Sequence, residues 1–133
     1  MTATMQKTRT TLSSLTITGV AAAAVASAAT MTVAAVGHAA GTSLAVSGAP
    51  IPVTGFGVLT AVFSLVGLVL AIVLSRTVRN PQRTFIRTTV VLTFLSLVPD
   101  AIADAAPATK ALLMVTHLVA AAIVIPAVAR RLS

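Results

Sequence analysis

The sequence predicts an all-α integral membrane protein, a four-helix up-down bundle whose N- and C-termini both lie in the cytoplasm. Of its 133 residues, 57% are hydrophobic and 8% are charged, whereas an average soluble domain carries about 25% charged residues. Four apolar segments are long enough to cross a hydrocarbon core of roughly 30 Å. Positive charges fill alternate gaps between these segments, as in polytopic membrane proteins, where Lys and Arg collect in short cytoplasmic loops.

The first helix is predicted over residues 12–36, which carry no charge and follow Lys7 and Arg9. A secretory signal peptide is the alternative, because the two basic residues resemble an n-region and residues 26–28 (Ala-Ser-Ala) resemble a cleavage site. The apolar core of a signal peptide spans only about 7–15 residues. We therefore expect a membrane-spanning helix that is not cleaved.

The second helix is predicted over residues 53–74, the most apolar part of the chain. The segment before it, residues 37–54, has no Lys or Arg and contains helix breakers, so it is predicted to be an extracytoplasmic loop. Its breakers are Gly41, Gly48, Pro50 and Pro52. A basic cytoplasmic loop follows over residues 75–87.

The third helix is predicted over residues 84–106 and the fourth over residues 109–129. The charge-free part of the third segment, residues 88–99, is too short to span a bilayer, so the helix must extend past both ends. This extension places Arg87 at the inner interface and Asp100 inside the outer part of the helix. Pro126 is expected to loosen the last turn of the fourth helix.

The arginines between the second and third apolar segments predict orientation and partners. They are Arg76, Arg79, Arg83 and Arg87. A net charge of +7 would suggest nucleic acid in a soluble protein, but the chain has no Trp or Tyr to stack on a base. We expect the bilayer as partner, with a homo-oligomer or another membrane protein in addition, no nucleic acid, and a multi-pass location in the bacterial plasma membrane.

Small and hydroxyl side chains follow one face of each of the first three helices. On the third helix they include two aspartates, and the opposite face is apolar. The three sets are Thr16, Gly19, Ala23, Ser27, Thr30 and Ala34; Gly57, Thr60, Ser64, Gly67, Ala71 and Ser75; and Thr89, Thr93, Ser96, Asp100 and Asp104. Such faces are typical of close helix packing in lipid, and a polar pathway through the bundle is the alternative.

Asp100, directly after Pro99, and His117 are the ionisable side chains expected within the membrane. A lone aspartate in hydrocarbon is costly, so we expect a partner. Asp100 and His117 lie at similar expected depths on adjacent helices, which predicts an intramembrane polar pair with Ser96 or Lys110 as a supporting partner. The pair could clamp the helices, or it could form a proton-responsive or ligand-binding site, since histidine titrates near neutral pH. Asp104 and Lys110 are expected to form an exposed pair of little energetic weight.

Little else suggests catalysis. The chain has no cysteine and no glutamate, which removes thiolate catalysis, thiolate metal ligation and disulfides. A Ser96–His117–Asp100 triad lacks any nucleophile motif around the serine, and a metal site from Asp100, Asp104 and His117 lacks supporting spacing. Haem ligation by two histidines is not favoured, because His38 falls in a loop. We expect no cofactor, no metal and no enzymatic activity.

Four segments in the second half of the chain carry a family resemblance: residues 97–100 (Leu-Val-Pro-Asp), 109–110 (Thr-Lys), 114–121 (Met-Val-Thr-His-Leu-Val-Ala-Ala) and 125–132 (Ile-Pro-Ala-Val-Ala-Arg-Arg-Leu). With these segments the chain resembles a family of small four-helix membrane proteins from actinobacteria that carry a domain of unknown function. Some members are mislabelled as envelope-biogenesis proteins. The likeness is most specific over residues 76–132. The resemblance implies four spanning helices, no established activity, and shared polar positions at Pro99, Asp100 and His117.

These observations favour a structural or accessory membrane component without catalytic activity. The alternative is a small proton-linked transporter or permease that uses Asp100 and His117. Four-helix drug exporters rely on an acidic residue in their first helix and on aromatic residues, and this chain has no acid there and only four Phe as aromatic residues.

Overall fold

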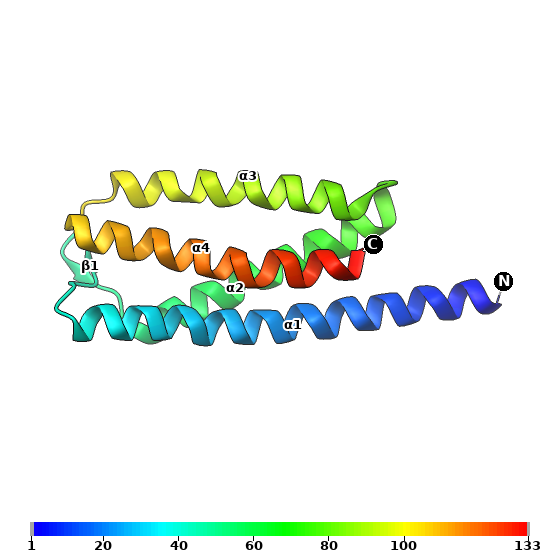
Figure 1. The fold of residues 1–133 in the computed structure, drawn as a ribbon, viewed down its shortest axis with the longest axis horizontal. Coiled ribbons are helices and arrows are strands. Elements are labelled where there is room, and N and C mark those ends of the chain that lie inside the picture. The colour runs from blue at the N-terminus through cyan, green and yellow to red at the C-terminus, as the bar shows by residue number, and fades with distance from the viewer. Residues whose placement is uncertain (1, 133) are drawn as a thin grey trace.

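Four long helices run antiparallel and pack side by side in the computed structural model (Figure 1). The structure describes residues 2–132, with side chains from residue 12, so the side chains of Lys7 and Arg9 lie outside the described part. The elements in chain order are α1 (Thr2–Ala39), β1 (Ala45–Val46), β2 (Ala49–Pro50), α2 (Val53–Thr77), α3 (Pro81–Ile102), α4 (Pro107–Ala129) and a terminal 3₁₀ turn, η1 (Arg130–Leu132). Each of the four α-helices contains a segment long and apolar enough to cross a membrane. The predicted four-helix membrane bundle is confirmed.

Proline decides where α3 begins and where α4 begins. The side chain of Asn80 accepts a hydrogen bond from the Arg83 amide at 3.3 Å, and Pro81 follows at the first helical position. Proline is well suited to that position because its missing N–H would have no partner there. The helix therefore begins at Pro81, and the predicted start at residue 84 is wrong by about one turn. Likewise α4 begins at Pro107 rather than at residue 109.

The predicted end of α3 at residue 106 is also wrong. The helix ends at Ile102, and Ala103 has an extended backbone with φ −60° and ψ 147°. Ala106 is extended as well, because the ring of Pro107 disfavours a helical conformation in the residue before it. Asp104 consequently lies in the connection between α3 and α4, not on the polar face of α3. The ends of α1 and α2 lie three residues beyond their predicted ends.

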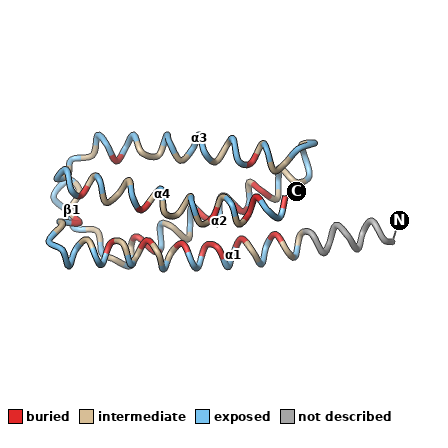
Figure 2. The backbone as a smooth tube through the Cα atoms, viewed as in Figure 1, coloured by how far each residue is buried: buried red, intermediate tan, exposed pale blue. Residues whose placement is uncertain are grey.

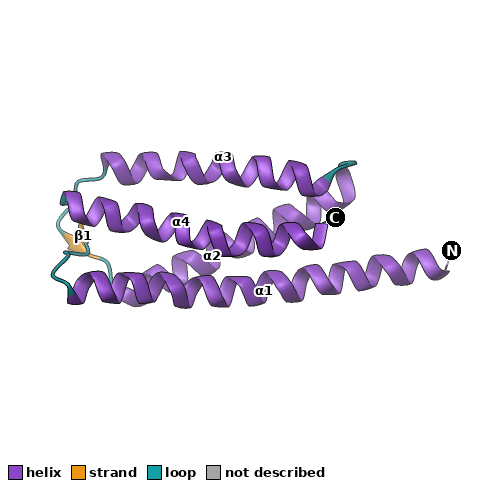
Figure 3. Cartoon of the chain, in the orientation of Figure 1, coloured by secondary structure: helices purple, strands orange, loops and turns teal. Residues whose placement is uncertain are grey.

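A short β-hairpin with two residues in each strand lies in the segment that was predicted to be an extracytoplasmic loop. Val46 pairs with Ala49 across a turn in which Ser47 has φ 53° and Gly48 has φ 78°. Positive φ at both central residues is the geometry of a type I′ turn, which matches the twist of the two strands. The Ser47 amide donates to the Asp104 carbonyl at 2.7 Å, so the hairpin is bound to the α3–α4 connection at this end of the bundle (Figure 3).

The small-residue faces of α1 and α2 pack against each other. Gly19 and Gly57 are buried at this interface, where a Cβ atom on Gly19 would lie 2.5 Å from a Leu68 methyl carbon. The Thr30 and Thr60 hydroxyls are 2.8 Å apart and form a hydrogen bond between the helices. In lipid, such close backbone approach and interhelical hydrogen bonds are what hold helices together. The predicted packing face is therefore used between α1 and α2.

Helix α3 is the least buried of the four (Figure 2). Only Phe85 and Asp100 are buried along its length, and they lie near its opposite ends. Phe85 belongs to the main hydrophobic cluster, together with residues of α1, α2, α4 and η1. Helix α3 is therefore held to the bundle near its two ends, and its middle makes few buried contacts.

Two glycines should respond in opposite ways to the addition of a methyl group. Gly19→Ala places a Cβ against the buried side chain of Leu68, and overpacking of this kind costs about 1–3 kcal/mol. Gly67→Ala meets no atom within 4 Å, and it should stabilise the protein by about 0.5–1 kcal/mol because glycine is a poor helix former. Unfolding in mixed micelles titrated with dodecyl sulfate measures both changes. Equal effects would contradict the helix packing described above.

Candidate polar site and cavity

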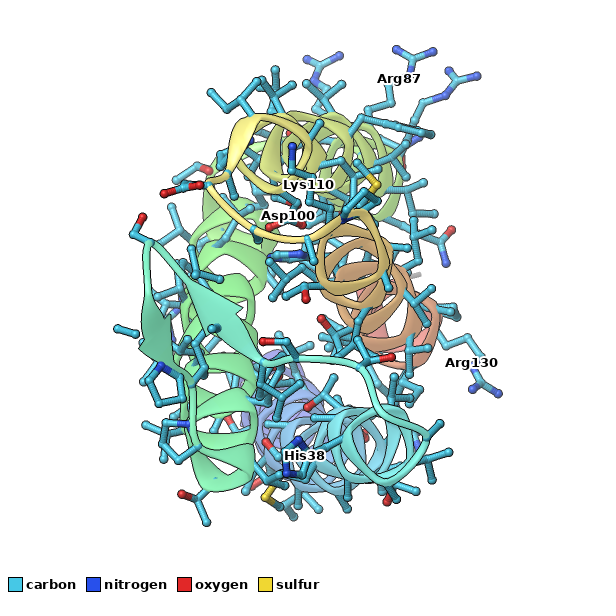
Figure 4. The ribbon with its side chains drawn as sticks, turned by 90° about the vertical axis from the view of Figure 1, so that its left-hand side faces the viewer. His38, Arg87, Asp100, Lys110 and Arg130 are labelled. Carbon is cyan, nitrogen blue, oxygen red and sulfur yellow. The ribbon has the colours of Figure 1, made fainter. Side chains whose placement is uncertain are left out.

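Asp100 and His117 meet between α3 and α4. His117 Nδ1 lies 2.6 Å from Asp100 Oδ2, and the carboxylate is buried while the imidazole is 39% exposed. Seen from the hairpin end, Asp100 lies beneath the α3–α4 connection on the side of α3 that faces α4 (Figure 4). The structure thus brings together the two side chains that the sequence singled out.

Asp100 and His117 lie at the same level of the bundle, although they lie at different distances from the ends of their helices. Asp100 lies in the last turn of α3, whereas His117 lies almost three turns into α4. The chain continues outward through residues 103–106 before α4 starts, so the beginning of α4 projects past the end of α3 (Figure 1). The sequence predicted similar depths for Asp100 and His117 because α3 was expected to end at residue 106. That expectation was wrong, since α3 ends at Ile102.

The surroundings of His117 determine which ring nitrogen carries a proton. Nδ1 lies 3.0 Å from the Leu113 carbonyl oxygen as well as 2.6 Å from the Asp100 carboxylate. A backbone carbonyl can only accept a hydrogen bond, so Nδ1 carries a proton that it donates to the Leu113 carbonyl. Asp100 Oδ2 lies at ion-pair distance from Nδ1 but accepts no hydrogen bond within the described residues. Among the described residues, no hydrogen-bond partner lies at Nε2. This nitrogen is the one open to a ligand or to a second proton.

The other residues of the predicted site lie elsewhere. The Ser96 hydroxyl donates to the Thr93 carbonyl at 2.6 Å, so it is engaged on its own helix. In the described part of the chain, Lys110 forms no salt bridge with Asp100 or with Asp104, and the expected Asp104–Lys110 pair is absent there. Pro99 is exposed and lies inside α3. No cluster of three or more potential metal ligands occurs within residues 2–132.

A cavity of about 330 Å³ lies between α2, α3 and α4. Thr89, Thr93 and Ser96 line it from α3, Ser64 and Gly67 from α2, and Thr116 and His117 from α4. The opposite face of α3, with Val91, Phe94, Leu95 and Val98, is exposed. The sequence identified the polar face of α3, for which helix packing was favoured and a polar pathway was the alternative. The cavity itself was missed, and glycine and hydroxyl residues at corresponding levels of α2 and α3 were the signal that could have indicated it.

Six arginines gather at the opposite end of the bundle from the hairpin. They are Arg76, Arg79, Arg83, Arg87, Arg130 and Arg131. The α2–α3 connection and the C-terminus lie together at that end (Figure 1). Arg131 Nε donates to the Thr18 hydroxyl at 3.1 Å, and Arg87 points away from the bundle (Figure 4). The basic and hairpin ends therefore differ strongly in charge.

A family model described as a family of unknown function, DUF6069, matches residues 10–133. The chain belongs to this family. The match covers all four membrane-spanning segments. It also includes Asp100, His117 and the six arginines. No curated protein and no solved structure matches the chain significantly. Membership in DUF6069 agrees with the resemblance to a family of unknown function, and it assigns no activity to the polar site.

Proposed function

We propose that this DUF6069 protein is a structural or accessory component of the bacterial plasma membrane, without catalytic activity, whose basic end faces the cytoplasm. The segregation of charge carries the proposal: six arginines lie at one end of the bundle, and the hairpin, Asp104 and Lys110 lie at the other. Arginine-rich loops remain on the cytoplasmic side during membrane insertion. The N-terminus and the C-terminus would then both be cytoplasmic.

A structural role for the polar pair fits its position. The contact between Asp100 and His117 joins α3 to α4 near the end of α3 where no other residue of that helix is buried. The exposed apolar face of α3 meets lipid, a second copy of the chain or another membrane protein. Crosslinking in native membranes tests for a second copy of the chain and for another membrane protein. If crosslinking found only monomers without a partner protein, this result would count against an accessory role.

Cysteine labelling tests the orientation, since the native chain has no thiol. We expect Ser47→Cys to react with a membrane-impermeant maleimide in intact cells, and Arg79→Cys to react only after permeabilisation. These positions lie at opposite ends of the bundle, and neither side chain forms a hydrogen bond or ion pair in the described structure. The reverse labelling pattern would place the arginines outside the cytoplasm and overturn the proposed topology.

A proton-linked permease is the alternative function, and one observation favours it. His117 lines the cavity and contacts a buried carboxylate, so a proton could be exchanged at Nε2 next to bound substrate. Reconstituted protein in liposomes with an imposed pH gradient tests this. Substrate-dependent proton flux that His117→Ala abolishes would support the permease, and its absence across candidate substrates would favour the structural role.

A further inference from the structure

The cavity is an elongated groove that opens sideways between α2 and α3. Its lining on α2 extends from Phe56 to Leu70, which corresponds to roughly 20 Å of helix at about 1.5 Å per residue. Phe63 on α2 and Leu92 on α3 line it while being 67% and 53% exposed. Side chains that line the groove and are also exposed mark its mouth. In a bilayer this mouth faces the hydrocarbon.

The wall of the groove suits a hydrocarbon chain despite its hydroxyl groups. Each of five hydroxyls donates to a backbone carbonyl of its own helix, at distances between 2.6 and 2.7 Å. These belong to Thr60, Thr89, Thr93, Ser96 and Thr116. Their protons are therefore not offered to a ligand, and most of the remaining lining is aliphatic or aromatic. The groove can therefore accept an apolar chain while these five donors stay satisfied.

The lining of the groove runs toward the basic end of the bundle, as far as Leu70 on α2 and Phe85 on α3. The connection between α2 and α3 joins the two helices that border the mouth, and it carries Arg79 between Arg76 and Arg83. In the described structure no carboxylate pairs with these three arginines, and the acids Asp100 and Asp104 belong to the hairpin end. Unpaired guanidinium groups at the membrane surface attract anionic headgroups.

We propose that the groove between α2 and α3 binds one acyl chain of an anionic phospholipid, whose phosphate lies against the arginines of the α2–α3 connection. The groove supplies the shape and apolar wall for the chain, and the charges supply selection for the headgroup. His117 also lines this groove, but its contact with Asp100 plays no part in lipid binding. It requires the bundle to lie in a bilayer, but it does not depend on which leaflet holds the basic end.

Native mass spectrometry of the full chain, released from detergent with lipid added, tests the proposal. The probes are phosphatidylglycerol and phosphatidylcholine with identical acyl chains. We expect a one-to-one complex that retains phosphatidylglycerol in preference to phosphatidylcholine. Arg79→Gln should weaken this binding about fivefold, the loss expected for one basic residue at the surface. Arg87→Gln removes the same charge from a side chain that points away from the bundle, and it should have a smaller effect.

Filling the groove tests the position of the acyl chain. Gly67→Leu adds a side chain where a Cβ meets no atom within 4 Å, so the fold should be kept while the bound lipid is lost. Ala122→Leu introduces the same leucine side chain at an exposed position of α4 outside the groove, and it should retain the lipid. The unfolding midpoint of each variant shows whether it is folded. If Gly67→Leu does not fold, the smaller Gly67→Ala substitution, which should weaken binding partially, provides the same test.

Three outcomes would overturn the proposal. Equal retention of the two phospholipids would exclude headgroup selection by the arginines. Unchanged phosphatidylglycerol binding in folded Gly67→Leu would place the lipid elsewhere. A lipid-independent dimer that Gly67→Leu disrupts would show that a second copy of the chain occupies the groove instead.

Discussion

His117→Ala should lower the free energy of unfolding by about 2–4 kcal/mol, because it leaves a buried carboxylate without its partner. Asp100 is buried and its Oδ2 atom has His117 as its neighbour at 2.6 Å. We place the effect below the upper limit for fully buried pairs, because the His117 side chain is 39% exposed and solvent can partly replace it. Unfolding in mixed micelles titrated with dodecyl sulfate provides the measurement.

A double-mutant cycle separates this contact from the general loss of a side chain. Asp100→Asn removes the buried charge while keeping the size of the side chain, so it should cost less than His117→Ala, which leaves that charge without its partner. The double variant should cost less than the sum of the two single variants, since the second change removes the charge that the first left unpaired. His38→Ala is the matched control, because the His38 side chain is exposed and forms no hydrogen bond in the described structure. Strict additivity would show that the two side chains do not interact.

Phe85→Ala should destabilise the bundle by about 2–3 kcal/mol. Phe85 is fully buried and is the one residue of α3 in the main hydrophobic cluster. In aqueous cores this change costs about 3–5 kcal/mol, but part of that cost is transfer from water, which is absent when the surroundings are lipid. The expected loss is therefore mainly the packing around the ring. The same titration with dodecyl sulfate measures it.

Phe94→Ala is the control for Phe85→Ala, since it removes the same atoms from an exposed position of the same helix. It should change stability by less than about 0.5 kcal/mol. Phe85 and Asp100 lie near opposite ends of α3 and share no partner, so Phe85→Ala and His117→Ala should act additively. A comparable loss from Phe94→Ala would mean that α3 is held along its whole length or packs against another chain there.

Local chemistry made the four helices predictable. Long apolar segments form helices in lipid because every backbone polar group must be satisfied within the segment, and this requirement does not depend on distant residues. The errors occurred at helix ends. Pro81 and Pro107 each begin a helix, and neither proline was used to predict a helix start from the sequence. Asp104 was misplaced on α3 for the same reason.

The sequence predicted which two residues form the polar site, but it did not predict how the side chains around them are arranged. Asp100 and His117 stood out because buried ionisable groups in a membrane need partners. Neither of the expected supporting partners, Ser96 and Lys110, contacts the Asp100 carboxylate in the described structure. The Ser96 hydroxyl instead donates to the Thr93 carbonyl. Hydroxyls in helices commonly bond to the preceding turn, and sequence spacing alone does not reveal whether they do so or reach another helix.

By itself, the sequence determined the bilayer as solvent, the number of spanning helices and the polar face of α3, because each follows from hydropathy, charge and a 3.6-residue period. Only the tertiary structure decided that this face borders a cavity, that His117 comes level with Asp100, and that the hairpin is bound to the α3–α4 connection. These features depend on where helices end and how far connections carry the chain. Errors of a few residues at a helix end move a side chain by several ångströms, which is enough to make or break a contact.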